Sequence, residues 1–337
     1  MTVPNPLSDL LAEKGVLLAD GATGTNLFAM GLEAGEAPEL WNGTHPERID
    51  KLHQDFVDAG ADIILTNSFG GTRHRLKLHN AQDRVFELNK RAAEIARAVA
   101  DRAPRKVIVA GSVGPTGELL LPLGALSYEE AVAAFAEQIE GLKAGGVDVV
   151  WIETMSSPDE IRAAAEAAVK VGLPFTYTGS FDTAGKTMMG LDPKDIHGVA
   201  GDIGEGPVAV GANCGVGASD ILSSLLDMTA ADPDAVTIVK GNCGIPEYRG
   251  AEIHYSGTPP LMAEYARLAR DAGAKIIGGC CGTSCEHLAA MRHALDDYTP
   301  RPRPTIEEIV GRIGPLRNKT ASEAGGEPGR ERRRRRG

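Results

Sequence analysis

The sequence of 337 residues predicts a single (β/α)8 barrel, and three observations support this prediction. Eight short apolar runs recur along the chain, and helical patterns follow most of them. The runs are apolar throughout instead of alternating with polar residues, as expected for parallel strands buried on both faces. Their number and the chain length suit a closed barrel, which typically needs about 250 residues. An open doubly wound sheet is the alternative, but its G-x-G-x-x-G fingerprint does not follow the first run.

The predicted strands are short, and each ends near glycine or polar residues. In chain order they cover residues 16–20, 61–66, 106–110, 148–152, 174–178, 208–211, 237–240 and 275–278. Helical periodicity is clearest over residues 83–101, 128–144, 158–171 and 259–272. Ser127 with Glu130, and Ser157 with Glu160, have the spacing of a capping box at a helix start. Pro158 suits the first helical position.

The composition is that of a globular protein, with 42% hydrophobic and 24% charged residues, which excludes a mostly disordered or fibrous chain. No apolar run approaches the ~18–20 residues needed to span a bilayer. No charged-then-apolar leader opens the sequence. We therefore expect a cytoplasmic protein without a membrane partner.

Charge is distributed unevenly along the chain. The net charge is −11, but residues 300–337 carry 11 basic and 5 acidic side chains, so this part is +6 and the rest is −17. An acidic body argues against nucleic acid as a partner, because duplex binding needs a basic surface. The sequence leaves the oligomeric state open, and an oligomer is possible.

The basic residues at the C-terminus concentrate in residues 332–336, after a stretch rich in Gly, Glu and Pro. Such a composition cannot bury a core. We predict a barrel domain over residues 10–298 and a C-terminal extension over 299–337, disordered after about residue 320. A tether to an anionic surface is the alternative interpretation of the arginine run.

Four of the five cysteines follow predicted strands, where the active sites of such barrels lie. Cys280 and Cys281 are adjacent, and neighbours on a regular strand point to opposite faces. They can share a metal only where the backbone leaves the extended form, which the flanking glycines permit. Cys214 and Cys243 both occur in Asn-Cys-Gly, and spacing does not decide which of them is the third ligand. Cys285, just inside the last predicted helix, is predicted to be structural.

Three thiolates with one open corner are the layout of a catalytic zinc site. With three thiolates the site has a charge of about −1, which suits it poorly to activating water. Zinc can still hold and deprotonate one more thiol. The cysteines therefore predict alkylation of a substrate sulfur by an activated methyl group, in a step that needs no general base.

Six motifs on successive predicted strand ends give the chain a family resemblance. They are Asp-Gly-Ala-Thr-Gly-Thr at 20–25, Thr-Asn-Ser-Phe at 66–69, Gly-Ser-Val-Gly-Pro at 111–115, Trp-Ile-Glu-Thr at 151–154, Gly-Ala-Asn-Cys at 211–214 and Gly-Gly-Cys-Cys-Gly-Thr at 278–283. In these motifs the chain resembles the zinc-dependent homocysteine S-methyltransferases. This family includes betaine–homocysteine methyltransferases and the homocysteine-binding module of cobalamin-dependent methionine synthases.

The resemblance implies an activity and a set of site residues. The reaction is methylation of homocysteine to methionine, with one Zn²⁺ per chain. The zinc ligands implied are Cys214, Cys280 and Cys281, with Cys243 as a bystander. The substrate ammonium is assigned to Asp20 and Glu153, and its carboxylate to the backbone around Gly21. From the residues alone, Asp20 could equally be a turn residue and Glu153 a partner in a salt bridge at the rim.

The resemblance leaves the methyl donor open between betaine, another small onium compound and a methyl-corrinoid. Gly70 follows Phe69, where vertebrate-type betaine enzymes carry a tyrosine, and their long C-terminal dimerisation arm has no counterpart. The alternative is a homocysteine-activating subunit that receives methyl from a separate corrinoid protein, the only route by which cobalamin would take part. Candidate donor-side or pocket residues are Thr23, Asn67, Phe69, Ser112, Asn213 and Tyr248, and an aromatic pocket could also draw on Phe28, Tyr177 and Phe181.

Overall fold

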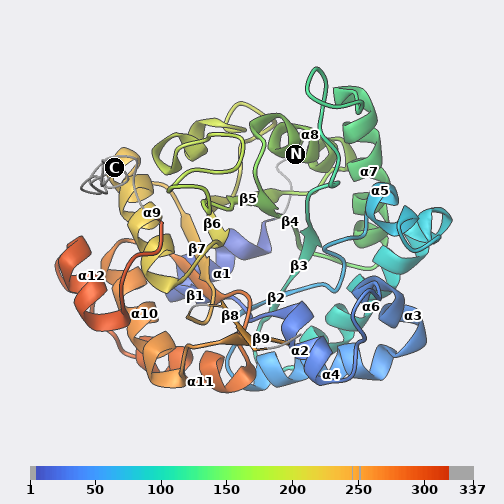
Figure 1. The fold of residues 1–337 in the computed structure, drawn as a ribbon. Coiled ribbons are helices and arrows are strands. Elements are labelled where there is room, and N and C mark those ends of the chain that lie inside the picture. Colours follow the sequence, from blue (N-terminus) through green and yellow to red (C-terminus); the bar gives the residue numbers. More distant parts are fainter. Residues whose placement is uncertain (1–4, 245, 250–251, 319–337) are drawn as a thin grey trace, which may run out of the picture.

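The computed structural model describes residues 5–244, 246–249 and 252–318, and it confirms the predicted (β/α)8 barrel (Figure 1). Eight parallel strands are hydrogen-bonded in the order β1-β10-β7-β6-β5-β4-β3-β2, and a parallel bridge between Ala19 and Ile63 joins the two ends. The strands are β1 (Leu17–Leu18), β2 (Ile63–Leu65), β3 (Ile108–Val113), β4 (Val149–Met155), β5 (Phe175–Gly179), β6 (Ala209–Cys214), β7 (Thr237–Gly241) and β10 (Ile276–Gly279). Each overlaps one predicted strand.

Helices surround the barrel (Figure 1). The α-helices are α1 (Pro6–Lys14), α2 (Thr23–Ala29), α3 (Trp41–Thr44), α4 (Pro46–Asp58), α5 (Arg73–Lys77), α6 (Val85–Arg102), α7 (Tyr128–Ala144), α8 (Pro158–Val171), α9 (Ala218–Ala231), α10 (Pro259–Asp271), α11 (Cys285–Leu295) and α12 (Ile306–Ile313). The 3₁₀ helices are η1 (Pro38–Leu40), η2 (Gln82–Arg84) and η3 (Pro193–Gly198). The strand β5 is followed by η3 instead of an α-helix, so the fifth strand–helix unit departs from the predicted alternation.

The two capping predictions had different outcomes. At α7, Ser127 accepts from the Glu130 backbone and the Glu130 side chain accepts from the Ser127 N–H, so the capping box is confirmed. At α8, Ser157 accepts from the Glu160 N–H, but the Glu160 carboxylate is bound by the backbone and hydroxyl of Thr116. The second capping box is therefore wrong, because a loop beyond β3 takes the carboxylate that would have closed it.

Two apolar layers hold the barrel together. Strand residues of one alternation, such as Ile63 and Trp151, pack inside it with Leu7 and Leu10 of α1. Residues of the other alternation, such as Ile64 and Val150, pack outward against the helices. The inner layer fills the barrel towards the N-terminal ends of the strands. The C-terminal ends are therefore where polar side chains can gather.

Beyond the strands, the antiparallel pair β8 (Pro246–Arg249) and β9 (Glu252–Tyr255) follows β7 and was not predicted. Within the described part of the chain, no helix is long and apolar enough to cross a membrane. The arginine run and the predicted disorder after about residue 320 lie outside the described residues.

Removing the residues after Thr320 is expected to leave zinc content, melting temperature and turnover unchanged. The described chain is attached to the barrel up to Asn318, whose backbone N–H and that of Arg317 donate to Asp220 at 2.8 and 3.0 Å. Truncation after Gly314 removes these bonds to a buried carboxylate and should destabilise the fold by about 1–3 kcal/mol. Thermal melting of both truncated chains checks this. A clear loss of turnover in the longer one would contradict it.

Candidate metal centre and substrate cavity

Three of the cysteines meet at the C-terminal ends of β6 and β10. The Sγ atoms of Cys214, Cys280 and Cys281 lie within 4.8 Å of one another. Cys214 has a φ of 64°, so the last residue of β6 leaves the extended form and the chain turns at the cluster. Gly282, with a φ of 80°, makes the corresponding turn after Cys281. The departure from the extended backbone that a Cys-Cys metal site requires is thus present.

Cys243 lies close to this cluster without joining it. Its backbone N–H donates to the Cys281 carbonyl at 2.9 Å, and its side chain is fully buried. Among the described residues, the cysteines that could share a metal are Cys214, Cys280 and Cys281. The geometry therefore groups the residues as the family resemblance does, while the choice of ligands stays a prediction.

Two asparagines hold the cysteine segments in place. Asn242 accepts from the Cys281 N–H at 3.0 Å and donates to the Gly215 carbonyl at 2.7 Å, which ties the end of β6 to the end of β10. Asn213 accepts from the Thr154 N–H at 2.8 Å and donates to the Thr154 hydroxyl at 2.7 Å. Both asparagines of the repeated Asn-Cys-Gly pattern therefore fix the backbone around the site.

A cavity of about 430 Å³ opens above the thiols. The cavity is lined by the three cysteines with Glu153 and Lys240, a group that we call the inner wall. It is also lined by Phe28, Phe69, Glu39, Arg75 and His79, which we call the outer wall. Of the predicted pocket residues, Gly21, Thr23, Asn67, Phe69 and Ser112 line it. Asn213 lies behind the wall, hydrogen-bonded to Thr154 and Thr178. The side chain of Tyr248, on β8, is outside the described part of the structure.

The predicted aromatic pocket is smaller than the sequence indicated. Phe28 and Phe69 line the cavity and are partly exposed. Tyr177 is buried, and its hydroxyl donates to the Ile196 carbonyl at 2.8 Å. Phe181 is also buried in the layer between barrel and helices. These two rings therefore belong to the core, because their strand and loop positions face the helices.

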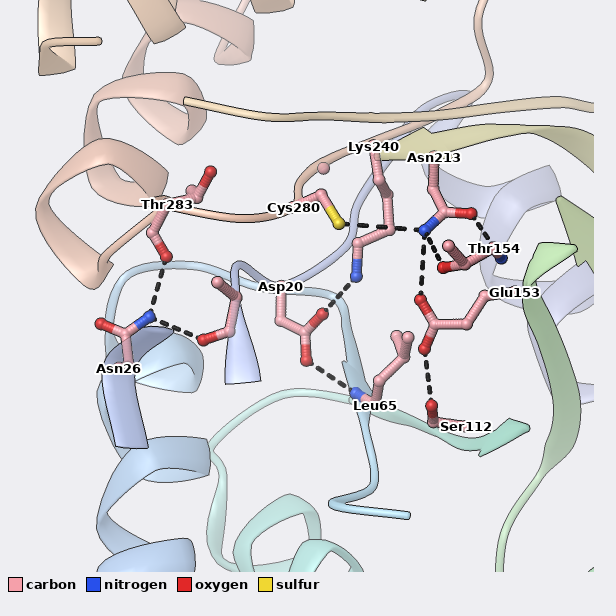
Figure 2. A network of polar contacts seen from close by, with 12 residues as sticks. Asp20, Asn26, Leu65, Ser112, Glu153, Thr154, Asn213, Lys240, Cys280 and Thr283 are labelled. Carbon is pink, nitrogen blue, oxygen red and sulfur yellow. Dashed lines mark hydrogen bonds and ion pairs between the residues drawn. The ribbon is translucent and has the colours of Figure 1, made fainter. Parts of the chain in front are cut away.

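Glu153 is the acidic group of the inner wall, and Figure 2 shows its carboxylate between Ser112 and Asn213. Its Oε1 accepts from the Ser112 hydroxyl at 2.5 Å, and the Asn213 amide donates to Oε2 at 3.4 Å. Burial raises the pKa of Glu153 to about 7, although the charge of Lys240 counteracts this shift. The carboxyl is thus held by two neutral partners and faces the cavity.

Asp20 is differently placed from Glu153. Its Oδ2 accepts from the Leu65 N–H and its Oδ1 from the Lys240 ammonium, both at 2.7 Å. Both side chains of this ion pair are at least 97% buried, with exposed fractions of 3% for Lys240 and 2% for Asp20. The sequence patterns did not indicate Lys240 as a residue of the site. The signal available was a lysine at the end of an apolar strand run, where a charge must have a buried partner.

Replacing Glu153 with glutamine is expected to stabilise the metal-free protein more at pH 8 than at pH 5. The pKa is about 7 in the folded protein against an ordinary 4.5, so the folded state keeps a proton that the unfolded chain has lost. Stability therefore falls as the pH rises from about 5 to above 7, and glutamine removes that penalty. Urea unfolding of the reduced, metal-free proteins at both pH values is the measurement. An equal effect at both would contradict the raised pKa.

The sequence profile of the homocysteine S-methyltransferase family matches residues 17–295. Two curated relatives are the methionine synthases of Mycobacterium tuberculosis and Mycobacterium leprae, 28% identical over 305 residues and 29% over 317 residues. The matches cover 86% and 88% of this chain but 25% and 26% of those proteins. The chain thus spans about a quarter of their length.

Two solved forms of one relative match over nearly their whole length. The homocysteine methyltransferase MmuM from Escherichia coli is 26% identical in its metallated form, with a TM-score of 0.71. The match covers 86% of this chain and 99% of that one. The oxidized form gives a TM-score of 0.72 with the same identity and coverage.

Proposed function

The chain belongs to the homocysteine S-methyltransferase family, and we propose that it transfers a methyl group to the sulfur of homocysteine to give methionine. The observation that carries this proposal is the group of three thiols at the inner wall of a cavity whose size suits small molecules. An acidic side chain, Glu153, and a cationic one, Lys240, line the same wall. Sulfur chemistry on a small amino acid needs these elements together.

The three thiols fit the zinc that this family uses. Cys214, Cys280 and Cys281 offer three soft donors close enough to share one ion, and thiolate sulfur is a preferred ligand of zinc. Bound zinc would strongly lower the pKa of an incoming thiol, so that the thiol would be present as a thiolate at neutral pH. Hydrogen bonds among the three thiols lower the pKa of Cys281 and raise the pKa values of Cys214 and Cys280, so the three sulfurs already contact one another.

The protein's own groups bind and orient the amino acid. Glu153 faces the cavity and can accept the substrate ammonium, with Ser112 and Asn213 fixing its carboxylate. Gly21 lines the cavity with its backbone, and no side chain fits there because a Cβ would lie 2.5 Å from the Thr283 carbonyl oxygen. Two anchors on the amino acid fix where its sulfur points. No side chain is required as a general base.

The donor side is proposed to take a small onium compound such as betaine or a sulfonium. Phe28 and Phe69 present aromatic rings to the outer cavity, and aromatic faces attract organic cations. Glu39 adds an acidic group there, accepting from the Gly70 N–H at 2.6 Å. A cationic methyl donor therefore has complementary partners in the same cavity as the thiols.

The direct test is methionine formation by the zinc-loaded protein. Homocysteine is supplied with betaine, a sulfonium donor or free methylcobalamin in separate reactions, and zinc is quantified in parallel. Methionine from an onium donor supports the proposal. A zinc-loaded protein that binds no homocysteine would contradict it.

A second candidate is a homocysteine-activating subunit that receives methyl from a separate corrinoid protein. The observation that favours it is that the curated relatives are methionine synthases of which this chain spans about a quarter. In the test above this candidate predicts homocysteine binding without turnover of onium donors. Turnover would then appear only on adding a methyl-corrinoid protein.

We propose a cytoplasmic location because the cysteines are not joined in disulfides. All five are free thiols in the structure. Thiols remain reduced in the cytosol, whereas oxidising compartments favour disulfides. The proposed site depends on three of them.

A further inference from the structure

Lys240 lines the cavity, but the proposed function assigns it no contact with the substrate. Of the residues that the structure describes, Lys240 and Glu153 belong to the inner wall, whereas Asp20 does not. The Lys240 ammonium therefore stands between the Asp20 carboxylate and the space that a substrate would occupy. Figure 2 shows the lysine side chain with Asp20 on one side and Glu153 on the other.

The position of Lys240 is built into the barrel. The side chain comes from β7 and reaches Asp20, which follows β1, across 220 positions of sequence. Gly278 on β10 makes room for it, because a Cβ there would lie 3.0 Å from the Cγ of Lys240. The ring of Trp151 lies 5.9 Å from its Nζ on the interior side. The ammonium is thus fixed in place and is not a flexible surface charge.

The lysine is charged and has donors to spare. Burial lowers its pKa, but the charges of Asp20 and Glu153 outweigh this and raise it above the ordinary value. An ammonium has three N–H donors. Among the described residues the hydrogen-bond acceptor is Asp20. Donors therefore remain for a ligand in the cavity.

On this basis we propose that Lys240 binds the carboxylate of the thiol substrate and that Asp20 holds Lys240 instead of the substrate ammonium. Glu153 is then the acceptor of the ammonium. This inference rests on the proposed function and deepens it, since it assigns the substrate carboxylate to Lys240 and gives Asp20 a positioning role. Without Lys240 the inner wall would present Glu153 and the thiolates, which repel a carboxylate.

Asp20 is a positioning residue in this assignment. Its two oxygens are engaged by the Leu65 N–H and by Lys240. Asp20 does not line the cavity, whereas Lys240 does, so a substrate ammonium would have to displace a buried lysine from a 2.7 Å ion pair to reach Asp20. Removing one partner of such a pair leaves an uncompensated buried charge. The two residues must therefore be changed together in a test.

The test measures binding of three thiols to the zinc-loaded protein by isothermal titration calorimetry. They are homocysteine, 4-mercaptobutanoate, which lacks the ammonium, and 3-aminopropanethiol, which lacks the carboxylate. The double variant Asp20→Asn/Lys240→Met removes the pair without leaving a lone charge. It is expected to bind homocysteine and 4-mercaptobutanoate about 10- to 100-fold more weakly, with 3-aminopropanethiol unchanged.

Glu153→Gln is the matched control with the opposite expectation. It should weaken binding of 3-aminopropanethiol and spare 4-mercaptobutanoate. A double variant that instead loses 3-aminopropanethiol would show that the pair holds the ammonium, and the inference would be overturned. Zinc content and melting temperature of each variant are measured alongside.

The wild-type protein provides an independent measurement should the double variant not fold. With Lys240 in the proposed role, 4-mercaptobutanoate should bind at least about tenfold more tightly than 1-butanethiol. Equal or weaker binding overturns the inference, because a carboxylate would then gain nothing from the cavity. Failure of wild-type protein to bind any of these thiols would instead contradict the proposed function itself.

Discussion

Replacing Cys280 with alanine is expected to abolish zinc binding and methyl transfer together. Its Sγ is one of three that meet at the cavity wall, and two remaining thiolates leave zinc with too few protein ligands for a stable site. Cys214→Ala is expected to have the same effect. Metal analysis of the purified variants, together with methionine formation at saturating substrate, measures both properties.

Cys243→Ala is the matched control for these variants. Cys243 is a buried cysteine of the same Asn-Cys-Gly type at the end of the next strand, but its thiol is outside the cluster. This variant is expected to keep about one zinc per chain and its activity, with a modest loss of stability from the missing sulfur. Loss of zinc from Cys243→Ala with retention in Cys214→Ala would show that the ligand assignment is wrong.

The barrel could be predicted because its strands are continuously apolar and its helix starts have strong local signals. Helices α7 and α8 begin and end at the predicted residues, and Ser127 and Ser157 cap their N-termini. The helix between β5 and β6 is only a 3₁₀ helix, η3. The β8–β9 pair is four residues per strand, too short to give a periodic signal.

The sequence indicated the cysteines of the thiol cluster, but it did not indicate how the charged residues around them are paired. Glycine-flanked cysteines at strand ends indicate a metal site, because cysteines in such positions are unusual as packing residues. The pairing of Lys240 with Asp20 depends on the distance between β7 and β1 across the barrel, which local patterns do not carry. The same holds for Glu160, whose carboxylate is taken by Thr116, 44 positions away.

Glu153→Gln is expected to weaken homocysteine binding by about 1.5–3 kcal/mol, roughly 10- to 150-fold, while leaving zinc content unchanged. Glutamine keeps the size of the side chain and an oxygen for the Ser112 hydroxyl, which donates to Oε1 in the wild type. What it loses is the charge that faces the cavity. Calorimetry for homocysteine and metal analysis of the same samples measure the two effects.

The same variant separates binding from chemistry. A substrate thiol deprotonated by zinc needs no base, so turnover at saturating homocysteine should fall far less than affinity. Glu153 is held by Ser112 and Asn213 in a position suited to an ammonium, and its pKa of about 7 would also suit a proton acceptor. The kinetic split decides between these roles. Unchanged affinity with turnover reduced by more than about a thousandfold, the scale of a lost general base, would place Glu153 in the chemical step.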